Sequence, residues 1–169
     1  YETGLMQKLL KPNSLYWLLV IVSVFVFSLS RFWDKKPVID WDMTLYYSYL
    51  PALFIYDDLK FEQPTKEWGK RHFYMNSDDE GNRYVKMTSG LAIMYSPFFA
   101  LGHLYASVSD IHPPDGFSTP YRLALLASSL FFALWGLHFL RRVLERFFSP
   151  LVSNLSVVLL FIGLSLLPI

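Results

Sequence analysis

Stretches of apolar residues alternate with polar stretches along this chain of 169 residues. The apolar stretches cover 14–30, 90–109, 121–140 and 151–169. The first contains no charged residue and would extend roughly 25 Å as an α-helix, which is just enough to cross the hydrocarbon core of a bilayer. The pattern therefore predicts an all-α integral membrane protein with about three transmembrane helices.

The basic residues predict which way these helices cross the membrane. Arg141, Arg142 and Arg146 lie in the short segment 141–150, which the positive-inside rule places in the cytoplasm. The connecting segment 110–120 contains acids and a histidine but no lysine or arginine, so we expect it on the outer side.

The N-terminal segment 1–13 carries two lysines and is expected to be cytoplasmic. The stretch 14–30 then crosses outward and 121–140 returns inward, followed by a further span at 151–169. Consequently 90–108 begins and ends on the outer side. We expect a juxtamembrane or interfacial helix there rather than a crossing.

A cleaved signal peptide is the alternative interpretation of 14–30, because lysines precede this stretch. The bulky Trp17 and Phe25 and the later apolar stretches favour an uncleaved anchor. The chain starts at Tyr1 rather than Met, and its last apolar stretch has no polar flank after Ile169. We therefore expect it to be part of a longer protein.

The outer segment 31–120 has an organisation of its own. Apolar residues at about 43–57 have helical spacing, and Pro51 is expected to kink or restart that helix. Residues at about 72–87 have the pattern of a β-hairpin around a glycine-containing loop. The acids at 78–80 lack the ligand spacing of a calcium loop, so we interpret them as a solvated turn.

Composition narrows the possible functions. The chain is 53% hydrophobic and 18% aromatic, and its formal net charge of +1 with no basic stripe gives no reason to expect a nucleic acid partner. The absence of cysteine excludes disulfides and thiolate metal sites. The four histidines have no metal-ligand spacing, so no metal site and no cofactor are predicted, and a need for a divalent metal stays open.

Carboxylates flank the aromatic helix in the stretch IDWDMTLYYSYLPALFIYDDLKF. Asp40 and Asp42 precede it, and Asp57 and Asp58 follow it. Asp42 at the helix start is either an N-cap or, among aromatic side chains at the membrane surface, a general base toward a hydroxyl group, and the two roles are compatible. We interpret Asp57 and Asp58 as the solvated end of the same helix.

Several phrases of the chain resemble a known class of membrane enzymes. These phrases are DMTLYYSYLPALFIY at 42–56, KMTSGLAIMYSPFF at 86–99 and DGFSTPY at 115–121. Together with the order of one span, an acidic outer loop and a return span, they resemble the GT-C superfamily of glycosyltransferases, in the branch of protein O-mannosyltransferases and aminoarabinose transferases. The resemblance covers most of this chain but only the N-terminal third or so of such an enzyme.

The resemblance implies that a sugar passes, with inversion, from a polyprenyl-phosphate donor to an acceptor outside the membrane. It implies membrane lipid as a partner and a bacterial inner membrane as the location. The acid of the first outer loop would be the catalytic base. Asp42 is its best counterpart and Asp40 the alternative, because many relatives have Asp-Glu where this chain has Asp42-Met43.

Further side chains are candidates for substrate binding. They are Tyr46, Tyr47, Lys86, Arg83, Asp115 and Arg122. The basic ones would hold the lipid phosphate or act as ordinary interface anchors. The tyrosines would stack on a sugar or belong to an interfacial aromatic belt. The aspartate would make a turn or line the site.

The sequence also bears on two functions other than a transferase. A non-catalytic membrane subunit would dock a protein partner through its outer loop and interfacial helices. A transporter is disfavoured, because the expected spans contain no charged residue at mid-depth to mark an ion or substrate path.

Overall fold

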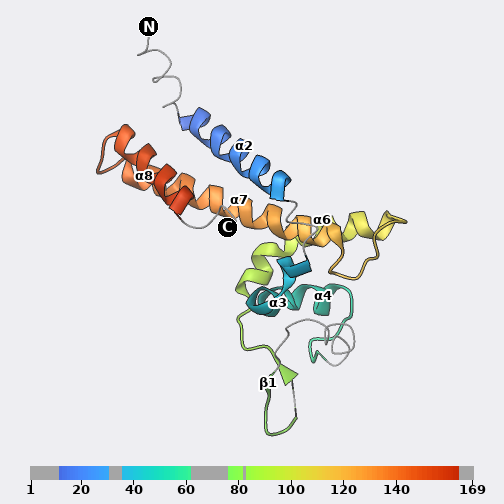
Figure 1. The fold of residues 1–169 in the computed structure, drawn as a ribbon. Helices are drawn as coiled ribbons and strands as arrows, with labels where there is room; N and C mark the ends of the chain where they lie inside the picture. Colours follow the sequence, from blue (N-terminus) through green and yellow to red (C-terminus); the bar gives the residue numbers. More distant parts are fainter. Residues whose placement is uncertain (1–11, 31–35, 62–75, 82, 164–169) are drawn as a thin grey trace. The chain divides into compact units, whose positions relative to one another are not determined.

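The computed structural model describes residues 12–30, 36–61, 76–81 and 83–163 (Figure 1). In chain order the elements are α2 (Pro12–Ser30), the 3-10 helix η2 (Lys36–Ile39), α3 (Trp41–Tyr47), α4 (Tyr49–Phe54), β1 (Asn76–Ser77), β2 (Arg83–Tyr84), α6 (Gly90–Val108), α7 (Thr119–Leu144) and α8 (Pro150–Gly163). The chain divides into two compact units, 33–129 and a second made of 1–32 with 130–169. The predicted, mainly helical fold is confirmed.

Two helices among the described residues are long and apolar enough to cross a membrane, namely α6 and α7. The apolar α8 is shorter, and the predicted continuation of its span at 164–169 lies outside the described residues. The expected cytoplasmic start, 1–13, also lies mostly outside them. Thus α6, which we expected at the interface, meets the same criterion of length and composition as α7, although Pro97 lies inside it.

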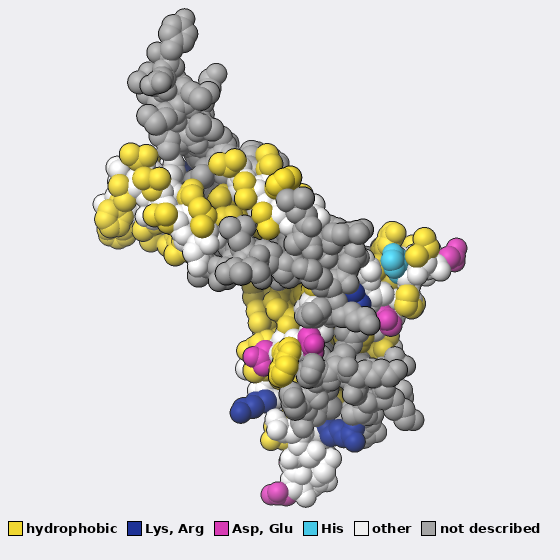
Figure 2. Space-filling view, viewed as in Figure 1, with side chains coloured by type: hydrophobic (Ala, Val, Ile, Leu, Met, Phe, Trp, Pro, Cys, Tyr) yellow, Lys and Arg dark blue, Asp and Glu magenta, His cyan; other side chains and the backbone are white. Residues whose placement is uncertain are grey.

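The unit made of 1–32 and 130–169 has a small apolar core. It joins one turn of α2 to the C-terminal half of α7 and to α8, through Leu19, Leu137, Val157 and Phe161. The hydroxyl of Ser23 donates to the carbonyl of Leu19 at 2.7 Å, so this polar group is satisfied inside its own helix. Hydrophobic side chains dominate the face of α8 visible in Figure 2.

The unit 33–129 has the larger core. Helices α3, α4 and α6 and the start of α7 contribute to it, and its fully buried members include Ile39, Tyr47, Ala52, Ala106 and Tyr121. Helices α6 and α7 approach each other closely at Gly102. A Cβ atom there would lie 3.1 Å from Cβ of Ala124 and 3.2 Å from the carbonyl oxygen of Pro120, so the small residue permits this contact.

The predicted helix at about 43–57 is two short helices. Helix α3 ends at Tyr47 and α4 begins at Tyr49, with Ser48 between them in α-helical conformation. Pro51 has no N–H to donate to the carbonyl four residues earlier, which accounts for the interruption. The predicted restart is confirmed.

The predicted hairpin is confirmed where the structure describes it. Strands β1 and β2 pair antiparallel, with Asn76 opposite Tyr84 and Ser77 opposite Arg83, and its beginning at 72–75 lies outside the described residues. In the turn the backbone N–H of Glu80 donates to Asp78 Oδ1 at 3.0 Å, and Gly81 has a φ of +84°. The acids therefore build an exposed turn, as predicted.

Candidate functional site

The two acids before the aromatic helix have different surroundings. Asp40 is the N-cap of α3, and its Oδ1 accepts a hydrogen bond from the backbone N–H of Trp41 at 3.0 Å. Asp42 lies in the first turn of α3 with an exposed side chain. Within the described part of the chain its carboxylate takes part in no hydrogen bond or ion pair. The capping role that we considered for Asp42 therefore belongs to Asp40, and Asp42 is the acid left available to a ligand.

Trp41, between these acids, has an unusual backbone. Its φ is +50°, in the left-handed region, which costs energy for a bulky residue. Its indole is 57% exposed, so burial of the ring does not account for the conformation. Strain of this kind is commonly found at functional sites, and here it occurs at the residue between the carboxylate that caps α3 and the one that does not.

The two candidate tyrosines of α3 have different environments. Tyr46 is partly exposed and remains accessible to a ligand. Tyr47 is only 1% exposed, and its hydroxyl donates to the carbonyl of Gly116 at 2.6 Å. Its ring packs edge-on against Phe99 and Phe117. The structure thus gives Tyr47 a packing role, which differs from the sugar contact expected from the sequence.

The segment before α7 is held against α3 and α4 by hydroxyl groups. Besides the bond from Tyr47, the hydroxyl of Tyr56 donates to the backbone carbonyl of Asp115 at 3.2 Å. Gly116 has a φ of +81°, and a Cβ atom there would lie 2.8 Å from Cβ of Pro51. Only glycine fits both the conformation and the space.

Asp115 is a turn residue. Its Oδ1 accepts from the backbone N–H groups of Phe117 at 2.8 Å and Ser118 at 2.7 Å, immediately before α7 begins. A carboxylate bound to two amides just before a helix orders the entry into that helix. Of the two roles expected for Asp115, the turn is the one its contacts account for.

The basic candidates are spread over the unit. Arg122 is half-buried, and its Nε donates to the carbonyl of Phe117 at 3.0 Å, so part of its guanidinium is committed to the fold. Arg83 lies in β2 and Lys86 follows that strand, and both side chains are exposed. The exposure of Arg83 and Lys86 leaves them accessible to an anion.

Two apolar cavities border α6. One, of about 490 Å³, lies between α4 and α6; it is lined by Tyr49, Leu50, Leu53, Phe54, Leu59, Ser89, Ala92, Ile93 and Ser96. The other, of about 440 Å³, lies between α6 and the start of α7; it includes Leu101, Tyr105, His112, Thr119 and Leu123. Both volumes are in the range of small-molecule sites.

Tyr49 connects the first cavity with the hairpin side of the unit. Its hydroxyl donates to the backbone carbonyl of Met87 at 2.7 Å, and burial raises the pKa of this hydroxyl above its ordinary value of 10.0. Its ring packs edge-on against Phe61. Tyr49 therefore lines this cavity while its hydroxyl is anchored to the backbone that follows β2.

The acids after α4 have a structural explanation that the sequence did not provide. Asp57 has a φ of +48°, and the backbone N–H of Asp58 donates to the carbonyl of Ala52 at 2.9 Å. The chain therefore leaves α4 through a residue in the left-handed region, which aspartate tolerates better than most residues.

Sequence reasoning missed the polar contact at the α6–α7 crossing. His103 Nδ1 and the hydroxyl of Tyr121 lie 2.6 Å apart, although the two residues are 18 positions apart in the chain. A histidine and a tyrosine in two apolar stretches were the available signal. Among the described residues no group of three or more His, Cys, Asp or Glu side chains could hold a metal ion.

Comparison with known proteins gives no relative: no family model matches the chain, and neither the curated proteins nor the solved structures contain a significant match.

Proposed function

We propose that this chain is the N-terminal part of an integral-membrane glycosyltransferase that uses a polyprenyl-phosphate-linked sugar on the extracytoplasmic side of a bacterial inner membrane. The observation that carries the proposal is that two acids close together in the sequence have different structural roles. Asp40 caps α3, and Asp42 offers an exposed carboxylate without a partner in the described chain. The N-terminus is cytoplasmic, and α2, α7 and α8 cross the membrane.

In this proposal Asp42 is the general base. Its carboxylate takes the proton of an acceptor hydroxyl while the hydroxyl oxygen attacks the anomeric carbon of the donor sugar. The bond between that carbon and the phosphate oxygen breaks, and the electron pair leaves with the polyprenyl phosphate. Attack from the face opposite the leaving group inverts the anomeric carbon. Residues of the rest of the enzyme would complete the donor site.

Side chains on α3 and elsewhere in the unit 33–129 would supply the binding functions. Tyr46 and Trp41 present aromatic faces beside Asp42, suited to stacking on a sugar. Arg83 and Lys86 are exposed cations that would attract the donor phosphate. The apolar cavity between α4 and α6 offers room for hydrocarbon. These features support an amphipathic donor over a soluble nucleotide sugar.

A second candidate function rests on a separate observation. Three large apolar side chains at the edge of the α4–α6 cavity are about half exposed, namely Leu53, Phe54 and Leu59. Exposed apolar side chains around a groove are typical of a protein contact surface. A non-catalytic membrane subunit would dock its partner here.

The test measures release of polyprenyl phosphate from a polyprenyl-phosphate sugar by the full-length purified protein with a membrane extract as acceptor source. Asp42→Asn should lower the rate by about 10²–10⁴-fold, the usual contribution of a general base. Asp110→Asn is the matched control, since Asp110 is an exposed acid of the same outer segment. This variant should release polyprenyl phosphate at the wild-type rate. Equal rates for the wild type and Asp42→Asn would rule out the proposed base. Absence of any turnover would favour the subunit.

A further inference from the structure

The last turn of α7 and the loop that leads to α8 contain more positive than negative charge. The segment 141–149 contains three arginines, Arg141, Arg142 and Arg146, and one acid, Glu145. The three arginines are not equivalent, because one is buried and two are exposed.

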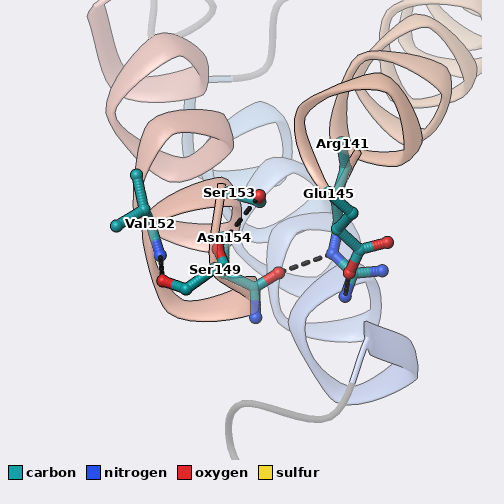
Figure 3. Close-up of polar contacts among 6 residues, drawn as sticks. All are labelled: Arg141, Glu145, Ser149, Val152, Ser153 and Asn154. Carbon is teal, nitrogen blue, oxygen red and sulfur yellow. Dashed lines mark hydrogen bonds and ion pairs between the residues drawn. The ribbon is translucent and has the colours of Figure 1, made fainter. Parts of the chain in front are cut away.

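Arg141 is the buried arginine, with only 6% of its surface exposed. Its Nε donates to Oδ1 of Asn154 on α8, and one of its terminal nitrogens donates to a carboxylate oxygen of Glu145, each at 2.5 Å (Figure 3). Asn154 is itself buried. A buried guanidinium needs partners of this kind, so Arg141 joins α7 to α8.

Glu145 is the one acid of the segment 141–149, and it is paired with Arg141. Arg142 and Arg146 are exposed, and neither forms a salt bridge or a side-chain hydrogen bond with any residue that the structure describes. Two uncompensated positive charges therefore remain within five consecutive positions, immediately after the apolar part of α7.

Exposed aromatic residues lie beside these charges. Phe147 is 75% exposed and Phe148 is 54% exposed, and both follow Arg146 directly. Val143, which precedes the two phenylalanines, and Leu151, which follows them, are also half exposed. Positive charges next to exposed aromatic and aliphatic side chains are the composition that binds at the boundary between headgroups and acyl chains.

We infer that the segment 142–148 binds the headgroups of anionic phospholipids. The guanidinium groups of Arg142 and Arg146 pair with phosphate oxygens, which their planar donor geometry suits, while Phe147 and Phe148 enter the adjoining acyl region. The charge complementarity selects an anionic lipid over a zwitterionic one. Arg141 has a different role, because it holds the two helices that present this surface. The inference does not depend on the proposed glycosyltransferase activity.

The experiment titrates the full-length protein in detergent micelles with phosphatidylglycerol and follows its Tm, from which an apparent affinity is obtained. Phosphatidylcholine with the same acyl chains and soluble glycerol 3-phosphate are parallel arms. Phosphatidylglycerol should bind more tightly than phosphatidylcholine, and glycerol 3-phosphate should not raise the Tm. The double variant Arg142→Gln/Arg146→Gln should lose about 25-fold in affinity for phosphatidylglycerol, or about fivefold per arginine near a membrane surface.

Three variants separate this surface from general effects of charge and folding. Arg142→Lys/Arg146→Lys keeps both charges and should retain most of the affinity. Lys60→Gln removes an exposed charge elsewhere and should change nothing. Arg141→Gln should lower the Tm without lipid, because it leaves Glu145 without its partner.

Several results would overturn the inference. They are an unchanged affinity for phosphatidylglycerol in the double glutamine variant, an equal loss in Lys60→Gln, equal affinities for the two lipids, and an equal stabilisation by glycerol 3-phosphate.

Discussion

Asp40 and Asp42 illustrate how local backbone geometry assigns different roles to identical side chains. The left-handed conformation of Trp41 separates them, and only the first carboxylate accepts a backbone N–H in the cap. The two neighbouring tyrosines differ in a similar way. Tyr47 is buried and its hydroxyl donates to the carbonyl of Gly116, whereas Tyr46 remains partly exposed. Candidate site residues in this chain are therefore distinguished by their hydrogen bonds rather than by their type.

Tyr49 gives a prediction about alkaline pH. Its pKa is 10.0 in the unfolded chain and higher in the folded protein, so folding is favoured by the neutral hydroxyl. This contribution is fully present below pH 10 and is lost as the pH rises through the raised folded pKa. Tyr49→Phe should cost about 1 kcal/mol at neutral pH, because the Met87 carbonyl loses its donor, and should flatten the fall in stability above pH 10.

The measurement is the Tm of the detergent-solubilised protein between pH 8 and pH 11.5. Tyr84→Phe is the control, since Tyr84 is an exposed hairpin residue, and its curve should follow that of the wild type. If the Tm of Tyr49→Phe fell with rising pH as steeply as that of the wild type, other groups would account for the loss of stability at alkaline pH.

At the scale of elements, the turn before α7 is what joins α7 to the short helices α3 and α4 inside the unit 33–129. The hydroxyls of Tyr47 and Tyr56 bind its backbone, and Gly116 contacts Pro51. A proline that interrupts a helix is thus also the surface against which a distant glycine packs.

Gly116→Ala should destabilise the protein for two reasons, its positive φ and the short distance to Pro51. Gly81→Ala isolates the first reason, because Gly81 has a similar φ of +84° but no atom within 4 Å of the position of an added Cβ. We expect Gly81→Ala to cost about 1 kcal/mol and Gly116→Ala about 1–3 kcal/mol more, measured as unfolding free energies. Equal costs would mean that the Pro51 contact relaxes without penalty.

Periodicity was enough to predict the helices α6 and α7, the restart at Pro51 and the hairpin, because these depend on residues close in sequence. It did not distinguish Asp40 from Asp42, because two acids two positions apart fit the same helix start and only the exact first residue of α3 decides which one caps it. Nor did it place Tyr47 in the core, because that role depends on a contact with Gly116, 69 positions away in the chain. The turn at Asp115 was one of the two roles expected from the sequence, and it depends on a contact only two positions away.

At the scale of the whole molecule, the proposal rests on which segments share a side of the membrane. Between Arg122 and Arg141, α7 contains no charged residue, and this stretch extends roughly 28 Å as a helix, close to the thickness of the hydrocarbon core. If α7 crosses, the segment 110–118 and the segment 141–149 lie on opposite sides. The acid of α3 belongs to the same compact unit as the first of these segments.

The most direct test of the central claim, that Asp42 works on the outer side, uses single cysteines in a chain that has none. Ile111→Cys and Phe147→Cys replace side chains that are 82% and 75% exposed, and Asp42→Cys reports on the acid itself. The measurement is labelling of intact cells by a membrane-impermeant maleimide, before and after permeabilisation. We expect labelling of positions 42 and 111 in intact cells and of position 147 only after permeabilisation. Labelling of position 147 from outside, or protection of position 42 until the membrane is opened, would contradict the central claim.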